Sequence, residues 1–144
     1  MKRRVYAIGK PKLEYAAKGI AEYAARLAKR TDFALEFLKA GRGESSRLLA
    51  GSSDSYRIVL DERGRLLTTA ELVAALKALE DRGDVKTASF LVGGADGHTG
   101  DLRESADMVW ALSPLTLQHE LALVVLLEQL YRADTVARGE PYHR

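Results

Sequence analysis

The stretch best suited to ligand chemistry is Phe90 to Gly97, where an apolar run breaks into three glycines. Ala88 to Val92 has the composition of a strand buried on both faces, and glycines after it let backbone amides approach a bound molecule unshielded by side chains. Leu112 to Pro114 forms a second break after an apolar run. Glycines after a strand also serve as plain turns, so the stretch alone leaves both interpretations open. The two breaks together predict a ligand site.

The glycine spacing does not fit the common phosphate-binding loops. A dinucleotide fingerprint needs G-x-G-x-x-G, and Gly93, Gly94 and Gly97 lack its first spacing. A Walker loop ends in Gly-Lys followed by Ser or Thr, a sequence that occurs nowhere in the chain. A small-molecule enzyme that binds a nucleotide through its phosphates is therefore a disfavoured class of function.

Length and composition predict one folded domain over residues 1–144. The 15.8 kDa chain is 47% hydrophobic and 29% charged, which is ordinary for a soluble globular protein. It contains no cysteine and only three scattered histidines, so we expect neither disulfides nor a metal site. No apolar stretch of signal-peptide length follows Met1 to Val5, and the longest apolar run, Leu121 to Leu127, is far shorter than a membrane span. We therefore expect a cytoplasmic protein without membrane association.

Charge is distributed unevenly along the chain. Residues 1–65 hold 15 Lys and Arg against 8 Asp and Glu, a net charge of +7, whereas residues 66–144 hold 7 against 12, a net charge of −5. A basic half can attract a polyanion such as RNA through phosphate contacts. Basic residues on a solvated helix face are the alternative explanation.

Strand-like runs alternate with helical patterns along the chain. We expect strands at 3–8, 33–38, 56–60, 88–92 and 108–112, and helices at 13–30, 47–50, 68–83, 102–106 and 116–137. Asp61 to Gly64 has the composition of a turn that ends the third strand. This alternation predicts an α/β fold with a largely parallel sheet and helices on both faces. Because ligands bind beyond the carboxyl ends of parallel strands, the turns after Leu60, Val92 and Leu112 should converge on one pocket.

The last helix, 116–137, is apolar around nearly its whole circumference between Leu121 and Leu127. Such a helix must be buried on several sides. In so small a chain, the spare apolar surface favours a partner subunit, most simply an identical one across a two-fold axis. A helix buried at the centre of its own chain is the alternative.

Several motifs in combination carry a resemblance to a known family. They are Val92 to Gly97, Leu112 to His119, Leu127 to Ala133 and the terminal Gly139 to Arg144, supported by Ala7 to Lys10 and Val59 to Asp61. Over essentially its whole length, the chain resembles the bacterial methyltransferases of pseudouridine in large-subunit ribosomal RNA, which are minimal members of the SPOUT class. Gln118 stands where most relatives have proline, and Glu120 where an uncharged residue is more usual. These departures concern the start of the last helix.

The resemblance implies a SPOUT-like α/β fold with a C-terminal trefoil knot, and a homodimer. It further implies that S-adenosylmethionine binds among the knot loops and that the N3 of a pseudouridine in helix 69 of 23S rRNA is methylated, on the assembled ribosome. Carried over by motif, the cofactor contacts are Leu60, Gly93, Leu112, Ser113, Pro114, Leu115, Thr116 and Leu117. An uncharged adenine and a sulfonium need backbone donors and acceptors and apolar walls rather than a phosphate cradle, which suits these loops.

Methyl transfer to nitrogen requires the protein to position the acceptor and to help remove the N3 proton. The resemblance assigns this role to the last residues, Tyr142, His143 and Arg144, contributed across the dimer. They combine a hydroxyl, an imidazole and a fixed cation that can hold phosphate or stabilise an oxyanion. Which of them acts as the base stays open. A non-catalytic module of the same fold that binds RNA or the ribosome is the alternative function.

Overall fold

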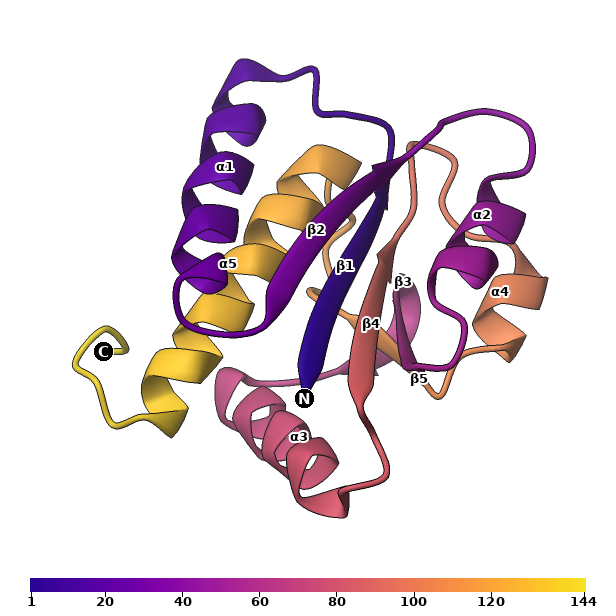
Figure 1. Ribbon diagram of the computed structural model, residues 1–144. Helices are drawn as coiled ribbons and strands as arrows, with labels where there is room; N and C mark the ends of the chain where they lie inside the picture. The colour runs from indigo at the N-terminus through magenta and orange to yellow at the C-terminus, as the bar shows by residue number, and fades with distance from the viewer.

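The computed structural model describes residues 1–144 and contains five strands and five helices that alternate along the chain (Figure 1). The strands are β1 (Lys2–Ile8), β2 (Phe33–Leu38), β3 (Tyr56–Leu66), β4 (Thr87–Val92) and β5 (Met108–Ala111). The helices are α1 (Glu14–Ala28), α2 (Glu44–Gly51), α3 (Thr69–Arg82), α4 (Gly100–Glu104) and α5 (His119–Ala137). The predicted alternation is confirmed.

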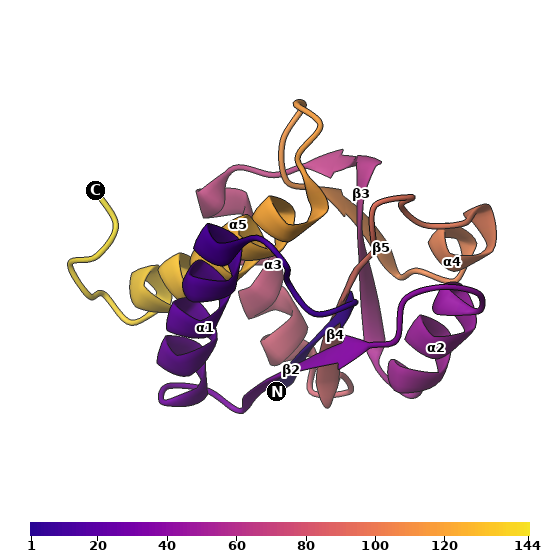
Figure 2. The same cartoon turned by 90° about the horizontal axis from the view of Figure 1, so that it is seen from above.

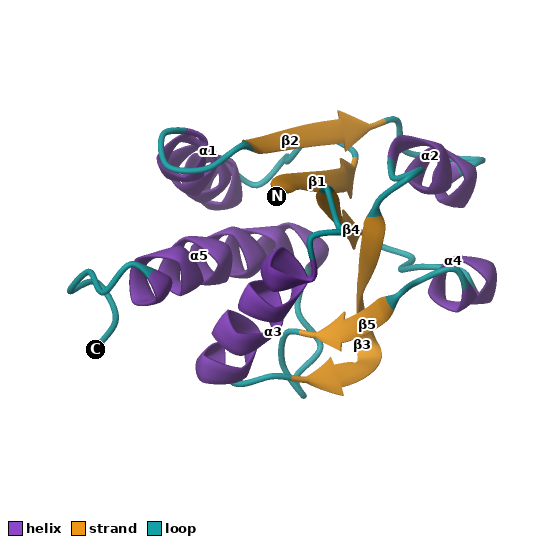
Figure 3. Cartoon of the chain, turned by 60° about the horizontal axis from the view of Figure 1, so that its bottom comes forward, coloured by secondary structure: helices purple, strands orange, loops and turns teal.

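The five strands form one sheet in the order β2-β1-β4-β3-β5, and every neighbouring pair is parallel. Helices α1, α3 and α5 cover one face, while α2 and α4 cover the other (Figures 2 and 3). The predicted α/β fold with helices on both faces is thus confirmed. In a parallel sheet all carboxyl ends share one edge, and β4, β3 and β5 are neighbours there. No helix combines the length and the hydropathy that a membrane span requires.

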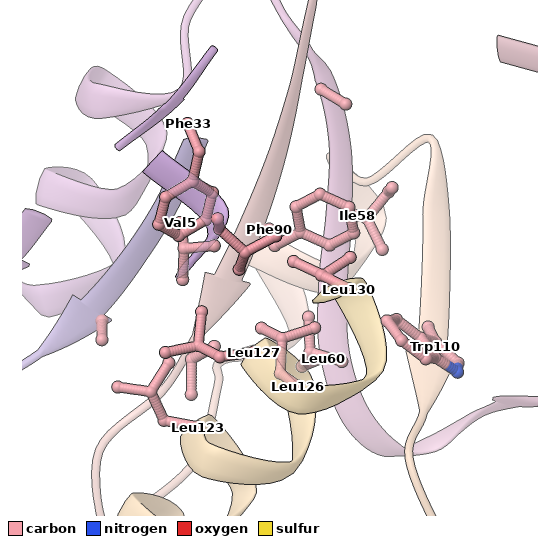
Figure 4. Close-up of a cluster of buried hydrophobic side chains, with 14 of the residues drawn as sticks. Val5, Phe33, Ile58, Leu60, Phe90, Trp110, Leu123, Leu126, Leu127 and Leu130 are labelled. Carbon is pink, nitrogen blue, oxygen red and sulfur yellow. The ribbon is translucent and has the colours of Figure 1, made fainter. Parts of the chain in front are cut away.

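The main core lies between the sheet and the layer of α1, α3 and α5. It contains 20 buried residues, among them Val5, Phe90, Trp110 and Leu127, which meet between the strands and α5 (Figure 4). A smaller cluster of five buried residues, including Leu48, lies beneath α2 and α4 on the other face. Packing on both faces explains why every residue of β4 from Ala88 to Val92 is buried.

Helix α3 begins and ends where its sequence signals predict. The side chain of Thr68 accepts a hydrogen bond from the backbone N–H of Glu71, and the Glu71 carboxylate accepts one from the backbone N–H of Thr68. This reciprocal pair is a capping box. Gly83 ends the helix with φ +76°, in the left-handed region that favours glycine.

Three predicted boundaries are wrong by three residues or more. Helix α2 starts at Glu44 rather than at Arg47. Strand β3 does not stop at Asp61 to Gly64 but continues to Leu66, because Arg65 and Leu66 resume parallel pairing with β5. Helix α5 starts at His119 rather than at Thr116, because Gln118 caps it there: its Oε1 accepts the backbone N–H groups of Glu120 at 2.8 Å and Leu121 at 3.0 Å.

Helix α5 packs between α1 and α3 against the sheet (Figure 3). Every residue from His119 to Val136 is buried or half-buried within the single chain. The fully apolar circumference is therefore covered largely by the chain's own elements. The apolar character of α5 alone does not require a partner subunit.

Candidate active site

A cavity of about 570 Å³ opens at the carboxyl ends of β3, β4 and β5. Its walls come from three segments, Leu60 to Arg63, Val92 to His98 and Leu112 to His119, together with Trp110 and Ala122. The three predicted strand ends therefore lie around one cavity. Seven of the eight predicted cofactor residues line it, namely Leu60, Gly93, Leu112, Ser113, Leu115, Thr116 and Leu117. Pro114 belongs to the same loop but is not part of the lining.

Glycines allow the backbone after β4 to fold tightly against the cavity. A Cβ on Gly93 would meet the backbone carbon of Gly97 and the ring of His98, both at 3.1 Å. Gly97 has φ +72°, and its N–H donates to the carbonyl of Gly94 at 3.0 Å, which closes a turn. The glycine pattern thus has a local steric cause, and it leaves backbone rather than side chains at the cavity wall.

The loop between β5 and α5 presents unpaired backbone groups. The N–H groups of Ser113, Thr116 and Leu117 in this loop donate no hydrogen bond within the chain, and neither does that of Gly93 after β4. Within this loop, the Oγ of Ser113 accepts the N–H of Leu115 at 2.9 Å, which shapes its bend. The Leu115 side chain is 72% exposed. Free donors beside an exposed apolar side chain suit a ligand with both polar and apolar parts.

A bulge in β3 places acidic side chains at the cavity. Leu60 and Arg65 both lie opposite Trp110 of β5, so Asp61 to Gly64 are additional residues inserted into the strand. The Asp61 side chain is only 7% exposed, and Arg103 of α4 contacts it at 3.3 Å. Glu62 accepts a hydrogen bond from the Thr116 hydroxyl at 2.7 Å, which ties the bulge to the loop after β5.

The bulge lies close against β5 at Gly64. A Cβ at this position would lie 2.6 Å from the backbone carbon and oxygen of Val109 and 2.7 Å from the N of Trp110. Only glycine fits there without moving one of the strands. The composition of 61–64 signals a turn, whereas the bulge depends on pairing with a distant strand, so sequence reasoning missed both acidic residues.

His98 lines the cavity beside Gly93. Its Nε2 lies 3.1 Å from the carbonyl oxygen of Leu91; a carbonyl can only accept, so Nε2 carries the proton. Burial lowers the pKa of His98 below its usual 6.5 and favours the neutral ring. His98 is not among the site residues that the sequence predicts.

The two departures from the family pattern have structural roles at the start of α5. Gln118 is the N-cap described above. Glu120 is 8% exposed, and its Oε1 accepts the backbone N–H groups of Lys12 at 2.8 Å and Leu13 at 2.9 Å. Glu120 thereby fixes the segment before α1 to the start of α5. His119, the first residue of α5, is half-buried and lines the cavity.

The predicted catalytic tail lies far from the cavity of its own chain. Tyr142, His143 and Arg144 follow the C-terminal end of α5, and Figure 2 shows the C-terminus beyond that end of the helix. The N-terminal end of α5, with His119 and Ala122, borders the cavity. A 19-residue helix is about 28 Å long. None of the three residues lines the cavity. The chain also holds no group of three or more His, Asp or Glu side chains that could bind a metal ion.

A comparison with known protein families gives the class to which this fold and cavity belong. The family model described as "Predicted SPOUT methyltransferase" matches residues 1–143. The chain belongs to the SPOUT methyltransferase family, which confirms the resemblance found in its motifs.

Similar proteins narrow this class further. The chain is 50% identical over 144 residues to Ribosomal RNA large subunit methyltransferase H of Thermus thermophilus, covering 100% of this chain and 99% of that protein. It is 42% identical to the protein of the same name from Deinococcus deserti, with full coverage of both. Among solved structures, a putative methylase family protein from Neisseria gonorrhoeae matches with a TM-score of 0.59 at 11% identity, covering 91% of this chain and 82% of that one. This last likeness concerns the fold.

Proposed function

We propose that this protein transfers a methyl group from S-adenosylmethionine to ribosomal RNA of the large subunit. Within that RNA, we propose that the methylated atom is the N3 of a pseudouridine in helix 69 of 23S rRNA and that the reaction takes place on the assembled ribosome. The observation that carries the proposal is the cavity at the carboxyl ends of β3, β4 and β5, whose walls are glycine backbone, unpaired loop amides and apolar side chains. The names of relatives at 42% to 50% identity support the ribosomal substrate.

The residues present fit S-adenosylmethionine. A volume of about 570 Å³ is within the usual range for small-molecule sites. Backbone amides of Gly93, Thr116 and Leu117 would hold its polar edges, and Leu60 and Leu112 would cover its apolar surfaces. Carboxylates of Asp61 and Glu62 at the wall bias the local potential toward a cation. When bound, S-adenosylmethionine supplies a methyl group on a positively charged sulfur.

Methyl transfer also requires the protein to hold the RNA base that receives the methyl group and to accept the proton that leaves N3. In its own chain, no tail residue reaches the cavity. We therefore propose a homodimer in which the tail of a second copy brings His143 and Arg144 to the cavity, the imidazole to accept the proton and the guanidinium to hold phosphate. The C-terminal knot, the single domain over 1–144 and the cytoplasmic location belong to the same proposal.

A Gly93→Arg variant tests the role of the cavity. Its side chain would occupy the space against Gly97 and His98, so we expect loss of S-adenosylmethionine binding by calorimetry and loss of methyl transfer to ribosomes that lack the modification. Gly83→Arg is the matched control: it adds the same charge at a glycine of positive φ with open space around it, just past the end of α3.

The same experiment separates an enzyme from a non-catalytic RNA-binding module. Cosedimentation with ribosomes should be unchanged in Gly93→Arg. If the wild-type protein cosediments with ribosomes but neither binds S-adenosylmethionine nor transfers methyl groups, the enzymatic proposal is wrong and the binding module is correct.

A further inference from the structure

The last residues of the chain are not uniformly exposed. Tyr142 is half-buried, while Pro141, His143 and Arg144 are exposed. The Tyr142 hydroxyl lies 3.1 Å from that of Tyr23 on α1. Its ring meets the ring of Tyr131 on α5 edge-on, with centroids 4.8 Å apart and planes at 86°. Edge-to-face contact at this separation is a favourable aromatic geometry.

Arg132 joins this aromatic site to the next tail residue. Its guanidinium lies over the Tyr142 ring, 4.8 Å from the centroid, and its Nη1 is 3.1 Å from Nδ1 of His143. Glu128 holds Arg132 in place through a 2.7 Å contact to Nε. Because a guanidinium can only donate, Nδ1 of His143 accepts and its proton is carried on Nε2. One arginine therefore orients both Tyr142 and His143.

A second set of contacts fixes the segment before Tyr142. Arg30, in the turn after α1, contacts Glu140 and the buried carboxylate of Asp134, each at 2.8 Å. The backbone N–H of Glu140 donates to the carbonyl of Thr135 at 2.9 Å. These contacts fix the chain before and after the bend at Gly139. The segment that leads to Tyr142 therefore starts from a fixed position.

We propose, on the basis of the function proposed above, that Tyr142 is a positioning residue rather than a catalytic one. Tyr23, Tyr131 and Arg132 form a tail clamp that seats Tyr142 on its own subunit and presents His143 and Arg144 for a neighbouring cavity. The clamp explains how a terminus, which is ordinarily mobile, can carry groups that must be placed accurately.

The chemistry of Tyr142 agrees with this role. Burial, together with the hydrogen bond to Tyr23, raises the pKa of Tyr142 to about 12. The phenol is therefore protonated at neutral pH and cannot serve as the base for the N3 proton. His143 and Arg144, which follow it, are exposed. His143 can accept a proton at Nδ1 once that atom leaves its hydrogen bond with Arg132.

Methyl transfer by Tyr142→Phe and Tyr142→Ala separates the two roles. Phe keeps the ring contacts and loses one hydrogen bond, so we expect kcat within roughly tenfold of the wild type and an unchanged pH profile. Ala removes the ring, so kcat should fall by more than about tenfold, with little change in KM for S-adenosylmethionine. If Phe is as inactive as Ala, or loses a limb of the pH profile, Tyr142 acts chemically and the proposal is overturned.

A second readout does not depend on methyl transfer. Backbone ¹⁵N relaxation of residues 142–144 should give order parameters of about 0.8 in the wild type and Tyr142→Phe, and below about 0.6 in Tyr142→Ala and Tyr131→Ala. Tyr15→Ala, an exposed tyrosine of α1, is the control and should leave the tail ordered. An ordered tail in a protein without methyltransferase activity would keep the clamp and reject the function. A mobile tail in the wild type would reject the clamp itself.

Discussion

The contact between Gly64 and β5 allows a quantitative test of how the cavity is built. In Gly64→Ala, the new Cβ would lie 2.6 Å from the backbone carbon and oxygen of Val109. Carbon atoms in ordinary contact lie about 3.5 to 4.0 Å apart, so the strands must separate locally by roughly 1 Å. The obstructing atoms are backbone and cannot rotate away. Because β5 is the edge strand, it can move without disturbing the rest of the sheet.

The expected cost follows from this displacement. Overpacking of this size destabilises a protein by about 1 to 3 kcal/mol. For a chain of this length, a change of about 2 kcal/mol lowers Tm by roughly 4 to 8 °C. The loop from Leu112 to Leu117 follows β5 directly, so its amides move with the strand. A misplacement of about 1 Å in catalytic geometry can slow a reaction on the order of a hundredfold.

Urea unfolding followed by circular dichroism measures the change in stability, and calorimetry with S-adenosylmethionine measures the change in binding. Gly83→Ala is the matched control, because it places a side chain at φ +76° in open space and should cost about 1 kcal/mol without affecting binding. We expect Gly64→Ala to lose binding and the control to keep it. Normal stability and normal binding in Gly64→Ala would refute the β3 bulge and its contact with β5.

Three further predictions concern the elements around the site. Glu120→Ala should lower the free energy of unfolding by about 2 to 4 kcal/mol in urea unfolding, because two backbone N–H groups lose their carboxylate acceptor. Glu120→Gln keeps an oxygen acceptor and should recover most of the loss. Equal loss in both variants would contradict the role of Glu120 as acceptor for Lys12 and Leu13. Thr68→Ala removes the capping box of α3 and should cost about 1 kcal/mol without changing affinity for S-adenosylmethionine; a change in calorimetric affinity would count against the separation of α3 from the cavity. The pKa of His98 is lowered below 6.5, so the unfolded chain takes up a proton there at a higher pH than the folded chain. The contribution of His98 should therefore leave stability unchanged above about pH 6.5 and lower it as the pH drops below that value. Thermal unfolding of His98→Gln should lack that part of the pH dependence, and an identical pH profile would contradict the buried neutral ring.

Local signals explain which parts of the fold are readable from sequence. The alternation of strands and helices follows from apolar periodicity, and the ends of α3 follow from Thr68, Glu71 and Gly83, whose effects are confined to one helix. The course of β3 past Leu60 is not readable, because Asp61 to Gly64 has turn composition and its pairing partner lies more than forty residues away. Tertiary pairing here overrides local composition.

The features of the site also fall into those that local sequence signals predict and those that they do not. Backbone-lined loops after β4 and β5 are predictable, since glycines and a Ser-Pro break follow apolar strands at the sheet edge where ligands bind. Asp61 and Glu62 reach the cavity through the bulge in β3, which has no sequence pattern of its own. The turn at Gly97 is readable from its glycines, but the contact of the His98 ring with the carbonyl of Leu91 is not. The hydroxyl contact between Tyr142 and Tyr23 joins positions 119 residues apart. No local sequence pattern predicts such a contact.

Backbone amide chemical shifts provide the most direct measurement of how the methyl donor is bound. When S-adenosylmethionine is added to ¹⁵N-labelled protein, the amides of Gly93, Thr116 and Leu117 should shift most strongly, because they line the cavity and have no hydrogen-bond acceptor within the chain. Amides at the far end of α3, near Gly83, should not move. Saturable binding with the largest shifts outside the three cavity segments, or no binding at all, would contradict the proposal that these loops hold the methyl donor.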